Sequence, residues 1–215
     1  MLDIFILYFA ILSFMGYIYE CIAMVLWTGK WDNRGFLFGP IIPIYGFCAV
    51  LGTLLFEYVY ITYNPLTVFL ISMFGSAVVE FVVHYFLEKK FNAIWWDYSK
   101  SPFNIQGRIC LPASIGFGIA GLIIVYIINP FVFNLIFSIP EWLVDLLAVI
   151  FVIIFTVDLT LTLNVLSKLV DKTQDIYKNI NKYLDYRLSA ITGKSEGVGK
   201  YFYAFVDKVE KRIKK

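Results

Sequence analysis

Five long runs of apolar residues limit what this chain can fold into. Each run is long enough to cross a hydrocarbon core of about 30 Å, because an α-helix rises about 1.5 Å per residue. The runs are continuously apolar and do not alternate with polar residues, which excludes a strand barrel. The sequence therefore predicts an all-α, polytopic membrane protein with five transmembrane helices. The expected spans cover residues 3–27, 37–60, 65–88, 109–128 and 142–166.

The composition agrees with a membrane protein and not with a soluble domain. Of the 215 residues, 60% are hydrophobic and only 16% are charged, whereas a soluble domain carries roughly 25% charged residues. The polar side chains are too few to cover a globule of this size, so lipid must cover the apolar surface. Asp3 stands where a removed signal peptide would have a basic leader, so we interpret the first apolar run as a retained span.

The positions of the lysines and arginines predict the orientation. All 18 fall into three segments: the connection 28–36, the connection 88–108 and the tail after residue 166. With five spans, the three segments lie on one side of the membrane, and the positive-inside rule makes that side the cytoplasm. We therefore expect the N-terminus outside and the C-terminus in the cytoplasm. A count of four or six spans would break this partition.

The tail is expected to form a cytoplasmic amphipathic helical domain, 167–215, after a transmembrane domain, 1–166. Apolar residues recur every three or four positions through 165–192, which is typical of an amphipathic helix. GKSEGVG at 193–199 breaks the pattern, and a second short amphipathic stretch follows at 202–213. The tail either lies on the inner leaflet or docks a partner protein. Its last basic residues suit anionic lipid: Lys208, Lys211, Arg212, Lys214 and Lys215.

Three acidic residues, Glu20, Glu80 and Asp158, lie deep inside predicted spans, away from their ends. Each lies roughly 10–13 Å below the cytoplasmic boundary at about 1.5 Å per residue. A charge inside a membrane is costly unless it is paired or hydrated, so it is a functional candidate. We expect the three acids to share an inner cavity. His84, the single histidine, follows Glu80 by four residues, and is either a packing residue or a partner whose tautomer and pKa Glu80 sets.

We predict no metal site and no cofactor. One histidine and scattered acids do not supply the ligands of a zinc site, and the three cysteines form no C-x-x-C pair. Residues 116–121 spell G-x-G-x-x-G, but no strand precedes them, so a dinucleotide site is not indicated and the small residues serve close helix packing. Pro40, Pro43 and Pro112 are expected to kink or open the second and fourth spans near the inner face.

A polar and aromatic segment, WWDYSKSPFNIQGR at 95–108, separates the third and fourth spans. Its tryptophans suit an interfacial anchor, but an anchor does not need Asp97, Asn104 or Arg108. We favour a polar pocket that this segment builds with the buried glutamates and Arg34, although both arginines could simply follow the positive-inside rule. The candidate pocket residues are Glu20, Asn33, Arg34, Glu80, His84, Trp96, Asp97, Asn104, Arg108 and Asp158.

Four features carry a resemblance to a known family: GYIYE at 16–20, NRGFLFGPIIPIYG at 33–46, Glu80, and WWDYSKSPFNIQGRICL at 95–111. In these stretches the chain resembles the ABC-transporter permease family (type IV), a group of small bacterial membrane proteins. The resemblance implies a multi-pass protein of the bacterial plasma membrane that acts as a transport subunit. The tail after residue 165 lies outside it.

Three functions fit these residues. The first, which we favour, is a permease-like subunit that moves a small solute with a separate ATPase, because the sequence has no G-x-x-x-x-G-K-[ST] loop. Five spans are few, so this subunit would need a homodimer or a different partner. The second is a membrane-embedded enzyme acting on a lipid headgroup or a lipid-linked substrate, although no nucleophile–base signature is present. Glu20, Glu80 or His84 would then be the general acid or base, and Arg34 and Arg108 would hold phosphate.

The third function is a non-catalytic membrane scaffold or regulator, in which the buried polar residues only hold the helices together and the tail docks partner proteins. In all three cases the lipid bilayer surrounds the chain, and we expect no nucleic-acid partner.

Overall fold

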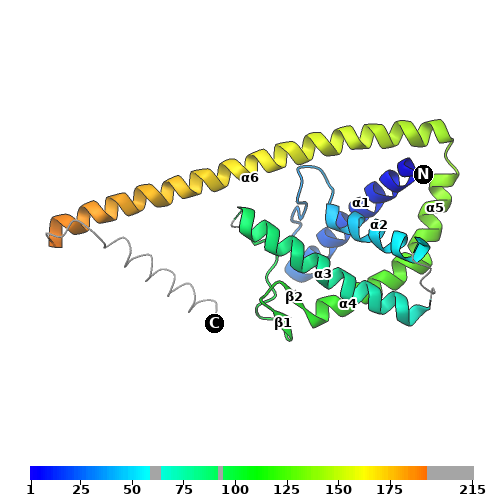
Figure 1. The fold of residues 1–215 in the computed structure, drawn as a ribbon, viewed down its shortest axis with the longest axis horizontal. Helices are drawn as coiled ribbons and strands as arrows, with labels where there is room; N and C mark the ends of the chain where they lie inside the picture. Colours follow the sequence, from blue (N-terminus) through cyan, green and yellow to red (C-terminus); the bar gives the residue numbers. More distant parts are fainter. Residues whose placement is uncertain (59–63, 92–93, 193–215) are drawn as a thin grey trace. The chain divides into compact units, whose positions relative to one another are not determined.

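The computed structural model describes residues 1–58, 64–91 and 94–192 and is mostly helical (Figure 1). The chain divides into two compact units, Met1–Leu163 and Asn164–Lys215. The helices are α1 (Leu2–Thr28), α2 (Pro43–Tyr58), α3 (Pro65–Phe91), α4 (Leu111–Ile123), a π-helix (Ile124–Ile128), α5 (Asn129–Phe137) and α6 (Glu141–Thr192). Two short strands, β1 (Asn104–Ile105) and β2 (Ile109–Cys110), pair antiparallel.

Four helical segments are long and apolar enough to cross a membrane: Leu2–Leu26, Pro65–Phe91, Leu111–Phe137 and Glu141–Thr173. The expected class of helical membrane protein is therefore confirmed. The apolar part of α2 is shorter, Pro43–Phe56, and a helix of that length falls several Å short of a hydrocarbon core of about 30 Å. The fifth crossing and the orientation of the chain stay predictions.

The second predicted span, 37–60, does not begin as a helix. Residues 36–42 run as bends and irregular chain, and α2 starts only at Pro43. Pro40 has no N–H group and disfavours helical geometry in the residue before it, and Pro43 repeats both effects. The N–H of Ile42 donates to the carbonyl of Ser13 (3.2 Å), which lies in the middle of α1. Non-helical backbone therefore lies beside the centre of a spanning helix.

The fourth predicted span, 109–128, is too short. We expected Asn129-Pro130 to end it, but the helix passes through a π-helical turn at Ile124–Ile128 and continues as α5 to Phe137. A proline inside a helix cannot donate to the preceding turn, and its ring crowds the carbonyl four residues earlier. The wider π turn relieves this crowding, so the proline is accommodated instead of ending the helix. The connection to α6 then shrinks to Ser138–Pro140, which carries no basic residue.

Small residues set how closely the helices of the first unit pack. α1 packs against α2, α3 against α4, and α5 against α1. A Cβ atom added to Gly16 would overlap the ring of Tyr45, and one added to Gly118 would lie 2.6 Å from the ring of Phe69. Glycine at these sites lets the helix backbones approach, as the sequence indicated for the fourth span.

A buried polar contact joins the three helices α1, α2 and α5. Tyr8 of α1 is fully buried and donates to Oδ1 of Asn129 at 2.6 Å, and its oxygen lies 3.2 Å from Thr53 of α2. The apolar core around Tyr8 comes from α1, α2, α5 and the start of α6.

The second unit begins with the last part of α6, which is helical to Thr192. Leu169, Ile176, Ile180 and Tyr183 are exposed there, and the amphipathic tail stays a prediction. The predicted second amphipathic stretch at 202–213 and the basic residues proposed for anionic lipid lie outside the described residues. The division into domains 1–166 and 167–215 stays a prediction.

Candidate functional site

The loop between α3 and α4 is held in one conformation by its own polar side chains. Asn104 donates to the carbonyl of Ser101 (2.8 Å) and accepts from the N–H of Gly107 (3.1 Å). Asp97 accepts from the N–H of Ser99 at 2.8 Å. Gly107 has a φ of 69°, and an added Cβ would lie 3.1 Å from the Asp97 carboxylate, so only glycine fits this turn. Asn104 and Asp97 therefore shape the loop.

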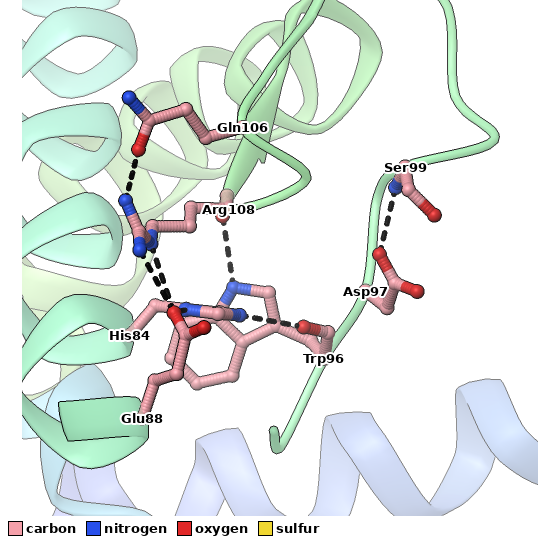
Figure 2. A network of polar contacts seen from close by, with 7 residues as sticks. All are labelled: His84, Glu88, Trp96, Asp97, Ser99, Gln106 and Arg108. Atoms are coloured by element: carbon pink, nitrogen blue, oxygen red, sulfur yellow. Dashed lines mark hydrogen bonds and ion pairs between the residues drawn. The ribbon is translucent and has the colours of Figure 1, made fainter. Parts of the chain in front are cut away.

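A network of four side chains fastens this loop to α3 (Figure 2). Nε2 of His84 lies 3.0 Å from the carbonyl of Trp96, and the indole of Trp96 donates to the carbonyl of Arg108 at 3.0 Å. The guanidinium of Arg108 donates twice to one oxygen of Glu88, at 3.2 and 2.8 Å, and also to Gln106. It lies over the rings of two α3 residues, Phe81 and Tyr85.

The carboxylate beside His84 is not the one that the sequence suggested. We considered Glu80, one helical turn before His84, but Nδ1 of His84 lies 3.6 Å from Glu88, one turn after it. Both glutamates have the same spacing from the histidine, and Arg108 draws Glu88 to this side of α3. His84 is 5% exposed, so the network buries it as an anchor of the loop.

Two of the three candidate acids, Glu20 and Glu80, each accept a hydrogen bond from a tyrosine in the first unit. Tyr45, in the first turns of α2, donates to Oε1 of Glu20 at 2.5 Å. Tyr98, from the loop, donates to Oε1 of Glu80 at 3.3 Å. We call these four residues the glutamate–tyrosine cluster. It joins α1, α2, α3 and the loop.

The charges of both acids act on the hydroxyl of Tyr98. Burial raises the pKa of the Tyr98 hydroxyl, and the negative charges of Glu80 and then of Glu20 raise it further. Glu80 is only 7% exposed, and its second oxygen, Oε2, has no hydrogen-bond partner among the described residues. The cluster thus contains a carboxylate oxygen that is buried and unsatisfied, which is costly in a protein interior.

Asp158 is bound by other groups than the first two acids. Its two carboxylate oxygens accept from the N–H groups of Phe38 (2.9 Å) and Gly39 (2.8 Å), and Thr162 donates to it at 3.2 Å. A Cβ added to Gly39 would lie 2.9 Å from the same carboxylate. Asp158 therefore holds the irregular segment that precedes α2. That the three acids share one cavity stays a prediction.

The polar turn at the start of that segment is exposed. Asn33 accepts from the N–H of Gly35 at 3.0 Å and stabilises the turn. The structure gives Arg34 no ion pair and no hydrogen bond in the described parts of the chain, and does not bring it to the glutamates. The segment instead meets the loop through rings, since Phe36 and Trp95 lie 5.5 Å apart.

The sequence did not predict five of these partners: Tyr45 and Tyr98 for the acids, Glu88 for Arg108, and the backbone N–H groups at 38 and 39 for Asp158. The i, i+4 spacing from His84 was an available signal for Glu88. Tyr45 and Tyr98 lie far along the chain from their glutamates, so no spacing rule connects them.

Outside the cluster, an open pocket of about 360 Å³ is lined by Tyr85, Glu88, Lys89 and Arg108. The described residues contain no group of three or more His, Cys, Asp or Glu side chains that could hold a metal ion.

These features define a multi-pass helical membrane protein that carries acidic groups and non-helical backbone inside its spanning unit. The chain belongs to the family described as "Putative ABC-transporter type IV", which matches residues 7–163. The match reaches beyond the stretches that carried the resemblance and includes the first part of α6. No curated protein and no solved structure matches the chain.

Proposed function

We propose that the chain is the permease-like subunit of a transporter in the bacterial plasma membrane, and that it moves a small solute with energy from a separate ATPase. The observation that carries this proposal is the interruption of the second span. Residues 36–42 are not helical, yet they lie beside the middle of α1 and are held by Asp158 of α6.

Such backbone is tolerated at membrane depth only where it is buried in protein or lines a polar cavity. In transporters, interrupted helices supply backbone groups to the solute site. Here the interruption ends at Pro43, and Tyr45, which binds Glu20, follows within one turn. The break is therefore followed within one helical turn by a member of the glutamate–tyrosine cluster, which supports a polar solute site in this part of the unit.

Membership of this family supports a role in transport, and the sequence supports ATP hydrolysis by a separate chain. The 215 residues contain no P-loop motif, so ATP hydrolysis by that route needs a second chain. With α2 as a fifth crossing, all basic segments face the cytoplasm, where such an ATPase works. A second copy of the chain, or a different membrane subunit, would complete the passage.

The lipid-chemistry alternative needed Arg34 and Arg108 to hold a phosphate group. Arg108 is paired with Glu88, and Arg34 is exposed. The geometry thus favours the permease over the enzyme.

The test is to isolate the tagged chain from its native membrane with a mild detergent, identify a co-purifying ATPase and measure ATP hydrolysis of the complex in liposomes. Gly39→Ala places a methyl group against Asp158 and should reduce the activity, because it displaces the interrupted segment. Gly52→Ala in α2 meets no atom within 4 Å and is the matched control. Absence of any ATPase from the complex, or equal activity of both variants, would contradict the proposal.

A further inference from the structure

The open pocket at the end of α3 has a positively charged lining. Of the residues that line it, Lys89 and Arg108 are cations, Glu88 is an acid and Tyr85 is a phenol. One positive charge is therefore in excess. The volume of about 360 Å³ admits a group the size of a phosphate. Such a lining attracts a ligand that carries one negative charge.

Both cations keep hydrogen-bond donors that the described residues do not use. The guanidinium of Arg108 has five N–H groups and donates with three of them, two to Glu88 and one to Gln106 (Figure 2). The ammonium of Lys89 has three N–H groups and donates one to the hydroxyl of Tyr85 at 3.2 Å. Two N–H groups of each cation are left for a ligand, and phosphate oxygens accept from both kinds of side chain.

Arg108 is fixed in place before any ligand arrives. Its Nη2 lies 2.8 Å from the Glu88 carboxylate, its guanidinium lies over the rings of Phe81 and Tyr85, and its side chain is only 15% exposed. A donor that is already ordered loses little conformational entropy on binding. Glu88 thus orients the arginine, and Lys89 supplies the charge that is left over.

An exposed apolar stripe on α3 leads to this pocket. Phe74, Val78, Val82 and Tyr85 follow one another at intervals of three or four residues, and each is between 45% and 64% exposed. Residues with this spacing lie on one side of a helix, and Lys89 comes one turn after the last of them. From Phe74 to Lys89 the stripe measures about 22 Å, which exceeds half of a hydrocarbon core of about 30 Å. The pocket therefore lies where the headgroup of a lipid on this stripe would be.

We propose that the pocket binds the phosphodiester group of one membrane phospholipid, whose acyl chains lie along the apolar stripe of α3. Lys89 and Arg108 donate to the phosphodiester oxygens, and the single negative charge of that group matches the excess charge of the lining. Glu20, Glu80 and His84, the candidate acids and bases, are not among the residues that line the pocket. The protein therefore holds this lipid without acting on it.

The experiment is equilibrium binding of radiolabelled dioctanoyl phosphatidylglycerol to the full-length chain in an uncharged detergent. Lys89→Gln removes the charge and should weaken binding by about tenfold, because it replaces a charge-assisted hydrogen bond by a neutral one. Lys89→Arg keeps the charge and should retain most of the binding. The control is Lys90→Gln, the same change at the next residue, whose ammonium lies 5.5 Å from the centre of the Phe86 ring and does not line the pocket. It should bind as the native chain does.

Two competitors identify the source of the phosphodiester. Glycerophosphoglycerol carries the headgroup without acyl chains, and dioctanoylglycerol carries the chains without a phosphodiester. Neither should displace the lipid at an equal concentration, because the site uses both parts. Full displacement by glycerophosphoglycerol would mean that the ligand is a free phosphate compound, and full displacement by dioctanoylglycerol that only the chains bind; either result overturns the proposal.

Equal weakening by Lys89→Gln and Lys90→Gln would also overturn the proposal, since it would show a general attraction of lipid to basic residues. None of these results bears on whether an ATPase co-purifies, so a failure here is distinct from a failure of the proposed function.

Discussion

Replacing Asp158 tests whether this acid is a structural clamp, as its contacts indicate, or a member of a solute site. Its carboxylate accepts two backbone hydrogen bonds, from Phe38 and Gly39. A hydrogen bond to a charged group contributes about 1.5–3 kcal/mol. Asp158→Asn keeps one acceptor oxygen and turns a donor toward the other N–H, so we expect it to destabilise the unit by about that amount. Asp158→Ala removes both bonds and should cost roughly twice as much.

The assay is thermal unfolding in detergent micelles, followed by tryptophan fluorescence, together with amide hydrogen exchange of the peptide that covers residues 36–42. For a chain of this length, Asp158→Asn should lower Tm by roughly 3–12 °C. Exchange at the amides of Phe38 and Gly39 should accelerate, because they lose their acceptor. Asp145→Asn, on the exposed surface of the same helix, is the control. If Asp158→Asn leaves both Tm and exchange unchanged, the clamp is refuted.

Three further outcomes follow from the packing and the loop. Gly46→Ala should lower the free energy of unfolding by about 1–3 kcal/mol through overpacking against α1. Gly52→Ala, in open space, should raise the free energy of unfolding by up to about 1 kcal/mol. Chemical denaturation compares the two variants. The Ser99 N–H holds the pKa of Asp97 below its ordinary 3.8. The ionised Asp97 carboxylate therefore stabilises the loop above that value, and this stabilisation is lost as the pH falls below it. Tryptophan fluorescence should show an acid step that Asp97→Asn lacks. Arg108→Lys should loosen the loop by about 1 kcal/mol, detected as a red shift of tryptophan emission.

The sequence predicted the class of fold because hydropathy alone identifies apolar helices. It also indicated that Pro40 and Pro43 would open the second span, and the helix does begin late. It did not predict that the helix would continue through Pro130. Whether a proline ends a helix or is accommodated depends on what packs around the next turn, and that information is not local.

The sequence singled out the acidic residues of the candidate site but not their hydrogen-bond partners. Buried acids are conspicuous in apolar runs, so Glu20, Glu80 and Asp158 were found. Their partners were not, because a hydroxyl or a backbone N–H group distant in sequence leaves no trace in the spacing. Arg34 was assigned to the pocket from its charge and from its place between Asn33 and Gly35, and it is exposed.

The π turn before Pro130 decides which way two successive stretches of helix face. On an uninterrupted α-helix, Gly121 and Val132 would lie about three turns apart on nearly the same side. One additional residue in the turn at Ile124–Ile128 rotates everything after it by about 100°. The glycine stripe of α4 can therefore face α3 while Val132 and Ile136 face the core around α1. Deleting a single residue from this turn would rotate Val132 and Ile136 out of that core. The additional residue in the π turn therefore lets one helix pack against α3 with its first part and against α1 with its second.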